Sequence, residues 1–122
     1  MSFMISIHLK HNIIYTVAEG KLTKEDYDRL IPLLEEKIES FGIIRWYFEM
    51  QDFEGWSLSA MWQDIKFDFK NREKLERIAM VGNKKWEKEL TQLMKPFTGA
   101  SIQYFDLTQK DEAKNWIKKI AT

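Results

Sequence analysis

The sequence predicts an α/β fold in which one mixed five-stranded sheet packs with four helices. Apolar residues alternate with polar ones near the N-terminus. Further along the chain, segments with helical spacing alternate with short, apolar, β-branched runs. With 122 residues, 44% of them hydrophobic, the chain can bury one sizeable core. We therefore expect residues 1–122 to form a single domain.

The first two strands are predicted between Met4 and Ala18, on either side of His11-Asn12. Apolar side chains recur there at every second residue, which is the repeat of a β-strand. Asparagine tolerates the backbone dihedrals of a tight turn. The chain is therefore expected to open with a β-hairpin.

A first helix is predicted from Thr23 to the Phe41-Gly42 break. Apolar side chains recur at helical spacing after Thr23, and Thr23 with Asp26 can cap the exposed amides of the first turn. Gly42 suits the end of the helix. A local kink is expected at Pro32, because an interior proline removes a backbone donor.

Residues 43–50 are β-branched and aromatic, and they are predicted to form a strand that is buried on at least one face. Gln51-Asp52 ends this strand, and Ser57 is the expected cap of a second helix. The apolar side chains of that helix recur at helical spacing and are expected to face the core. They are Leu58, Met61, Trp62, Ile65 and Phe69.

The same alternation of strand and helix continues after residue 70. A strand is predicted over residues 75–81, and Gly82-Asn83 stops it. A third helix follows, ended by Pro96 and Gly99. Its expected inward side chains are Trp86, Leu90, Leu93, Met94 and Phe97.

The last strand is predicted over residues 100–105, and Thr108 with Asp111 is expected to open a final helix. The inward side chains of this helix are expected to be Ala113, Trp116, Ile117 and Ile120. The full order is therefore ββαβαβαβα. Right-handed crossovers place the later strands parallel, so the sheet combines an N-terminal hairpin with parallel strands.

The composition excludes several classes of function. The 19 basic residues balance 19 acidic ones, so nucleic acid is not an expected partner. The lack of cysteine excludes disulfides, thiolate nucleophiles and thiolate metal sites. Ser6 and His8 interrupt the N-terminal apolar residues, unlike a secretion signal, and no stretch approaches the roughly 18 apolar residues of a membrane span. A cytoplasmic location is expected.

Several short strings fall in an order typical of one known family. They are Asp52-Phe53-Glu54-Gly55-Trp56, Trp62 with Asp64 and Lys66, Arg77 to Gly82 leading to Lys85-Trp86, Tyr104-Phe105-Asp106, and Ala113 with Trp116. On these strings the chain resembles the SpoIIAA-like family, distant relatives of the STAS domains of anti-sigma factor antagonists. The resemblance covers nearly the whole chain and implies a STAS-like fold.

The signalling STAS proteins carry a phosphorylatable serine between an aspartate and a glycine in the loop after this strand, and a kinase partner docks there. The matching stretch from Asp52 to Ser57 has no serine between Asp52 and Gly55. Ser57 is expected to cap a helix, and it is a weak candidate phosphosite because the positive end of a helix tolerates a phosphate.

In an open α/β sheet, ligands bind beyond the carboxyl ends of the parallel strands. This rim comprises residues 51–57, 82–85 and 106–108. Its carboxylates could perform acid/base chemistry, although loop acids are commonly solvated or cap helices. They belong to Glu49, Asp52, Glu54 and Asp106.

Two further features of the sequence bear on ligand chemistry. The stretch from Gly82 to Lys85 could present amides and ammonium groups to an anion, but Asn83 is expected to act simply as a helix cap. His8 and His11 fall on opposite faces of an extended strand, which suggests no metal site. No cofactor and no enzymatic activity are expected.

The positions of the aromatic residues suggest where a ligand or partner could bind. Trp46, Trp62, Trp86 and Trp116 lie on predicted inward stripes, whereas Phe53, Trp56 and Phe67 lie outside the core pattern. Phe53 and Trp56 are expected to fold over the end of the sheet as a lid, to line a pocket for an apolar molecule, or to form a patch for a partner. The candidate binding residues are Asp52, Phe53, Gly55, Trp56, Ser57, Trp62, Lys85 and Trp86.

The leading functional hypothesis is a non-enzymatic, STAS-like regulatory or interaction module. It would bind a protein partner, or a second copy of itself as a homodimer, through the segment from Asp52 to Trp62. The alternative is a carrier or sensor of a small apolar, lipid-like molecule, with a pocket between the second and third helices and the sheet rim. Other members of this broad group resemble the lipid-binding CRAL-TRIO fold, which implies such a ligand. An enzymatic interpretation would need a buried carboxylate in that pocket.

Overall fold

A computed structural model describes residues 5–119 of the chain. The predictions for Met4 and Ile120 fall outside these residues, and the side chain of Phe97 is likewise not described. In order, the elements are β1 (Ile5–Lys10), β2 (Ile13–Leu22), α1 (Lys24–Phe41), β3 (Ile44–Trp56), α2 (Leu58–Lys70), β4 (Leu75–Gly82), α3 (Lys85–Met94), η1 (Lys95–Phe97), β5 (Ser101–Asp106), η2 (Leu107–Gln109) and α4 (Lys110–Lys118).

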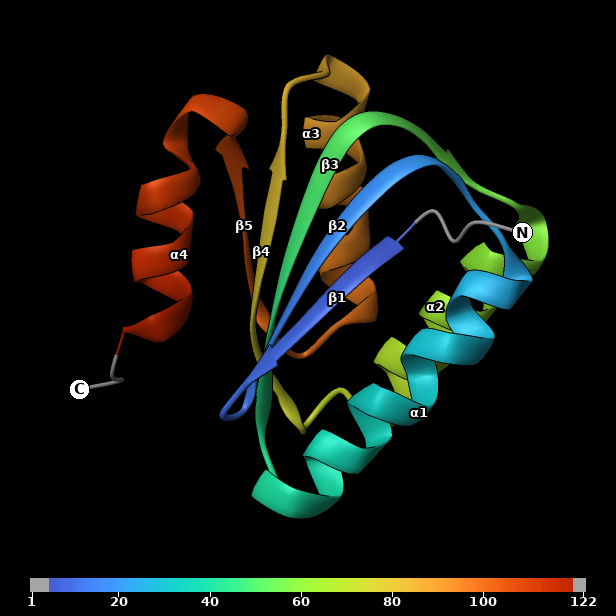
Figure 1. Ribbon diagram of the computed structural model, residues 1–122, viewed down its shortest axis with the longest axis vertical. Coiled ribbons are helices and arrows are strands. Elements are labelled where there is room, and N and C mark those ends of the chain that lie inside the picture. Colours follow the sequence, from blue (N-terminus) through green and yellow to red (C-terminus); the bar gives the residue numbers. More distant parts are fainter. Residues whose placement is uncertain (1–4, 120–122) are drawn as a thin grey trace.

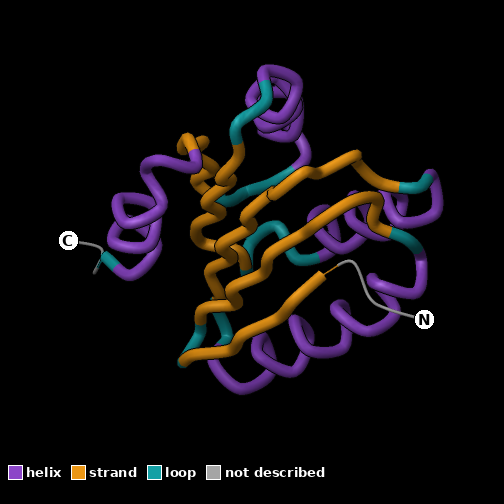
Figure 2. Tube along the Cα trace, turned by 45° about the horizontal axis from the view of Figure 1, so that its top comes forward, coloured by secondary structure: helices purple, strands orange, loops and turns teal. Residues whose placement is uncertain are grey.

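The predicted sheet is confirmed. Its five strands follow the order β1-β2-β3-β4-β5, with β1 antiparallel to β2 and each later pair parallel. Helices α1, α2 and α3 lie on one side of the sheet, and α4 lies on the other (Figures 1 and 2). Within residues 5–119, no helix is long and apolar enough to cross a membrane.

The hairpin and the first helix form where the sequence predicts them. His11 adopts a φ of 54° in the tight turn between β1 and β2. The Thr23 side chain accepts from the Asp26 amide, and an Asp26 carboxylate oxygen accepts from the Thr23 amide at 2.8 Å. Helix α1 continues through Pro32 and ends at Gly42, whose φ is 81°.

The strand β3 is longer than predicted, and so is β2. The expected loop from Asp52 to Trp56 is wrong, because these residues belong to β3, and Gly55 and Trp56 pair with the end of β2. The register shifts on either side of Gly20, and Asp52 takes a φ of 47°. Pairing beyond this irregularity satisfies backbone groups that a loop would leave to solvent. It also carries Trp56 along the sheet to the start of α2.

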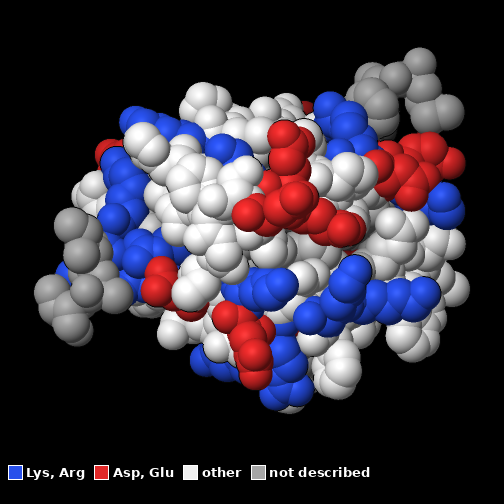
Figure 3. Space-filling model, turned by 90° about the horizontal axis from the view of Figure 1, so that it is seen from below, with Lys and Arg blue, Asp and Glu red and all other residues white. Residues whose placement is uncertain are grey.

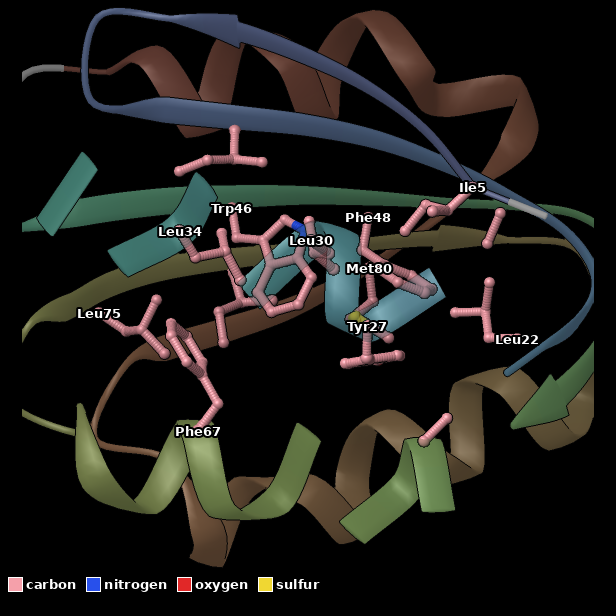
Figure 4. Packing of buried hydrophobic residues seen from close by; sticks show 14 of the residues in the cluster. Ile5, Leu22, Tyr27, Leu30, Leu34, Trp46, Phe48, Phe67, Leu75 and Met80 are labelled. Carbon is pink, nitrogen blue, oxygen red and sulfur yellow. The ribbon is translucent and has the colours of Figure 1, made fainter. Parts of the chain in front are cut away.

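The larger hydrophobic core lies between the sheet and helices α1 and α2. Figure 4 shows Phe67 pointing from α2 into this core, toward the strands. The Trp46 indole lies in the same core, and its Nε1 donates to Thr16 Oγ1 at 3.0 Å. A smaller core under α4 contains Tyr47 and Ile117. The prediction that Trp46 is a core residue is therefore confirmed.

The predicted inner face of α2 is wrong. Leu58, Trp62 and Phe69 are 81%, 63% and 61% exposed, and Met61 also faces outward. The buried side chains of this helix are Ala60, Asp64, Phe67 and Asp68. Phe67 supplies the apolar contact with the core, and the aspartates are tolerated inside because hydrogen bonds satisfy most of their oxygens. Apolar periodicity alone therefore indicates the wrong face of α2.

Helix α3 differs from prediction in a similar way. Leu93 is 68% exposed and Trp86 is 38% exposed, whereas the buried side chains are Glu87 and Thr91. The Glu87 carboxylate accepts from the amides of Asn83 and Lys84, each at 3.0 Å. The expected cap at Asn83 is therefore wrong: Glu87 reaches back and satisfies the amides that open the helix.

The final helix begins later than predicted. Asp106 Oδ1 accepts from the Thr108 amide at 3.0 Å, so Asp106 caps the short 3₁₀ helix η2, and α4 starts only at Lys110. The expectation that Thr108 opens the helix is wrong, because Thr108 is a donor within η2. Trp116 is partly buried against the smaller core, with its ring 5.8 Å from that of Phe105.

Candidate functional site

A pocket of about 110 Å³ lies between α2 and α3. Its lining is mainly apolar and is formed by Trp56, Met61, Asp64, Ile65, Asp68, Leu90, Leu93 and Met94. A much smaller cavity lies against the sheet and shares Trp56, Asp64, Asp68 and Met94 with the pocket. Two carboxyl groups therefore lie where the pocket meets the core.

The carboxyl groups belong to Asp64 and Asp68, one helical turn apart on the inner face of α2. Asp64 Oδ1 accepts from the Tyr27 hydroxyl at 2.8 Å, and that hydroxyl accepts from Trp56 Nε1 at 2.8 Å. Asp64 and Asp68 also hydrogen-bond to each other. The chain of hydrogen bonds thus joins the end of β3, helix α1 and helix α2.

Burial in this apolar setting disfavours the charged form of both aspartates. Loss of solvation raises the pKa of Asp64 to about 6, and the hydrogen bonds from Tyr27 and Asp68 limit that rise. Loss of solvation raises the pKa of Asp68 well above its ordinary value, and the neighbouring charge of Asp64 raises it further. Two carboxyl groups this close favour sharing a proton.

Asp68 has one oxygen without a partner. The residue is 3% exposed, and its Oδ1 makes no hydrogen bond although it is fully buried. Among the described residues, no lysine or arginine lines the pocket or the cavity beneath it. The site therefore combines an apolar lining, an unsatisfied acceptor and no compensating cation.

Local sequence explains how the site is assembled. The Ser57 side chain accepts from the Ala60 amide at 3.1 Å and caps α2 directly after β3. Trp56 packs edge-on against Phe53 at 4.9 Å between ring centroids, and Phe53 stacks against Trp86 at 5.9 Å. These rings connect the wall of the pocket to the start of α3.

The structure brings together only some of the predicted site residues. Phe53 is fully buried, and Trp56 is half-buried against the core and lines the pocket, so the lid interpretation stays a prediction. Trp86 joins them, as described above. Ser57 caps α2 as predicted, whereas Asp52, Trp62 and Lys85 are exposed. Lys85 lies 3.9 Å from Glu89, and Gly55 holds a φ of 99° within β3.

Sequence reasoning missed the two residues that give the pocket its chemistry. Asp64 belongs to one of the strings that resemble the SpoIIAA-like family, and no sequence pattern predicts a role for Asp68. A signal did exist: the two aspartates are four residues apart, about a quarter of a turn around α2 from its apolar stripe. That pattern is ordinary for a solvated helix face, so nothing in it distinguishes a buried pair.

The rim carboxylates do not converge on this pocket. Glu49 is buried near α4, where it accepts from the Tyr47 hydroxyl at 2.7 Å and from the Gln51 amide and lies 3.7 Å from Lys110 Nζ. At the predicted anion site, the Glu87 carboxylate already occupies the amides that open α3. Within residues 5–119, no group of three or more His, Asp or Glu side chains is placed to hold a metal ion.

Comparison with known proteins agrees with this architecture. The model of the SpoIIAA-like family matches residues 13–118. A similar crystal structure, from Shewanella loihica, is described as an uncharacterised protein with a SpoIIAA-like fold. It is 30% identical in sequence, with a TM-score of 0.74, and the alignment covers 93% of this chain and 91% of that one. No curated protein matches the chain. The family match spans most of the sequence, and the chain belongs to the SpoIIAA-like family.

Proposed function

We propose that this protein binds a small, mainly apolar molecule in the pocket between α2 and α3, and that it does so as a carrier or sensor rather than as an enzyme. The pocket itself carries the proposal. It is enclosed by two helices and the end of β3, and most of its lining is methionine, leucine, isoleucine and tryptophan. Pockets of this composition favour ligands with a large apolar surface.

The size of the pocket suits the end of an extended molecule. A volume of about 110 Å³ is of the order of an engineered cavity of roughly 150 Å³ that accepts benzene. The exposed side chains of Met61 and Leu93 lie at its mouth, so a longer chain can continue over apolar surface. Methionine side chains adapt to ligands of different shape.

The proposal of binding without catalysis is supported by the arrangement of the polar groups. Asp64 is already engaged by Tyr27 and by Asp68. The described lining otherwise offers apolar side chains and no hydroxyl, thiol or amine to act as a nucleophile. A buried carboxylate pair is nevertheless the feature that the enzymatic interpretation requires, so activity assays belong beside binding assays.

Native mass spectrometry of gently purified protein tests the proposal. We expect a bound adduct of lipid size that is lost when the protein is unfolded. The variant Leu90→Trp fills the pocket and should lose the adduct. The variant Leu58→Trp adds the same ring on the exposed side of α2 and should keep it. A bare mass, together with no binding of added apolar probes, would contradict the proposal.

A second candidate function is self-association as an interaction module. One observation favours it: Leu58, Trp62 and Phe69 are exposed along one side of α2, and Leu93 of α3 is exposed as well. Apolar side chains gathered in this way often mark an interface, and a second copy of the chain offers a matching apolar surface. Light scattering with size-exclusion chromatography checks this. A strict monomer at high concentration removes self-association, whereas a dimer that Trp62→Ser abolishes supports it.

Three expectations from the sequence stay predictions. On the face shown in Figure 3, acidic and basic side chains are interspersed, which is consistent with the expectation that nucleic acid is not a partner. The cytoplasmic location stays a prediction. Phosphorylation of Ser57 stays a minor one, and intact-mass analysis of protein from its native cells tests it. The Ser57 hydroxyl already accepts from the Ala60 amide.

A further inference from the structure

Asp68 offers an acceptor that no described protein group uses. Its carboxyl group bonds to Asp64 on one side, while Oδ1 has no partner and is fully buried. Asp68 also lines both the pocket and the cavity beneath it. A buried acceptor without a donor is unfavourable, and a ligand that supplies a donor removes this penalty. The bound molecule should therefore present an N–H or O–H group at this point.

The negative charge of the Asp64–Asp68 pair favours a positively charged hydrogen-bond donor on the ligand. Two adjacent carboxyl groups that share one proton carry one negative charge between them, and burial raises the pKa of both. No lysine or arginine among the described lining residues balances that charge. In an apolar pocket an opposite charge is strongly attracted, and a like charge is repelled. An ammonium group satisfies both the charge and the free acceptor, whereas a carboxylate satisfies neither.

We propose that the ligand is an amphiphilic amine, whose ammonium group binds Asp68 at the base of the pocket and whose apolar body lies between α2 and α3. This inference rests on the proposed function, because it names the chemical class of the molecule in the same pocket. The ammonium donates to Asp68 Oδ1 and shares the negative charge of the pair. The apolar body contacts Met61, Leu90 and Leu93 toward the mouth.

Isothermal titration calorimetry with ten-carbon probes below their micelle concentrations tests the inference. The probes are decylamine, decanol, decanoate and decyltrimethylammonium, which share a chain and differ in head group. We expect decylamine to bind at least about tenfold more tightly than each of the others, because only its head group has both a positive charge and N–H donors. Decyltrimethylammonium has the positive charge but no N–H donor, and decanol has an O–H donor but no charge.

The double variant Asp64→Asn/Asp68→Asn should reduce the preference for decylamine over decanol by about tenfold, because the two side chains keep their shape and the pair loses its charge. Asp111→Asn, on α4 across the sheet, should leave that preference unchanged. Thermal unfolding establishes that each variant is folded, and the comparison of probes on the unaltered protein needs no variant. Decanol or decanoate binding as tightly as decylamine would overturn the amine inference and leave the proposed function standing. No binding by any probe would overturn both.

Discussion

Raising the pH from 4 to 8 should cost this protein stability through the carboxyl pair on α2. The pKa of Asp64 is about 6 in the folded protein, because burial removes its solvation, and 3.8 is its ordinary value. Between these values the folded state binds more protons than the unfolded state. Stability from Asp64 is therefore fully present below pH 3.8 and is lost as the pH rises through about 6.

The size of the effect follows from the two pKa values. At about 1.4 kcal/mol for each pH unit, the interval from 3.8 to about 6 corresponds to a loss of about 3 kcal/mol. The pKa of Asp68 is also raised, by burial and then by the charge of Asp64, so its loss of stability falls at higher pH. A loss of this size is a large fraction of the roughly 5–15 kcal/mol that stabilises a typical domain.

Urea unfolding at several pH values, followed by circular dichroism, measures the effect in the variant Asp64→Asn and in the unaltered protein. The variant cannot titrate at this position, so it should gain about 3 kcal/mol relative to the unaltered protein between pH 4 and pH 8. Taking the difference cancels the acid denaturation common to both proteins. A constant difference for Asp64→Asn would refute a buried, titrating Asp64.

Three further predictions about the packing are tested by chemical denaturation. Phe67→Ala should lower the free energy of unfolding by about 3–5 kcal/mol because Phe67 fills the core, whereas Phe69→Ala on the same helix should lower it by less than about 0.5 kcal/mol. Equal losses would show that α2 turns a different face to the core. Gly82→Ala should cost about 1–3 kcal/mol, because its Cβ would lie 2.4 Å from Glu87 Oε1, and less in a Glu87→Ala background. Tyr27→Phe should cost about 1–3 kcal/mol, since it removes a buried hydroxyl with two hydrogen-bond partners; an unchanged stability would contradict that network.

The fold was predictable because local signals and long-range packing agree in most of the chain. Thr23 and Asp26 form the predicted cap at the start of α1. The φ of 54° at His11 fits the tight turn that is expected between the first two strands. The short β-branched runs separated by helices leave few topologies other than a mixed sheet. The later start of α4 escaped prediction, because Asp106 and Thr108 form a local turn that resembles a helix cap in sequence.

The orientation of α2 could not be predicted from periodicity. Its sequence has an apolar stripe that includes Trp62 and an acidic side with Asp64 and Asp68, and the usual rule turns the stripe inward. The burial of the acidic side depends on the Tyr27 hydroxyl, which lies 37 residues away in the chain. Long-range hydrogen bonds of this kind leave no periodic signal.

Sequence reasoning offers a place for the candidate site but not its chemistry. A pocket between the second and third helices and the sheet rim is the alternative hypothesis from the sequence, and Phe53 and Trp56 are expected to form a lid, to line such a pocket or to form a patch for a partner. The structure places Trp56 in the wall of such a pocket and Phe53 directly behind it. The acidic base of the pocket depends on side chains that approach only after α2 packs on α1 and the sheet.

The Trp56 indole tests the central claim of a ligand pocket most directly. Its N–H donates to Tyr27 while its ring lines the pocket, so its nuclear magnetic resonance signal reports on both. During titration with decylamine, we expect this signal and the amide signals of Leu90 and Met94 to shift most, with little change in α4. No shift at Trp56, or shifts concentrated on α4, would contradict a binding site between α2 and α3.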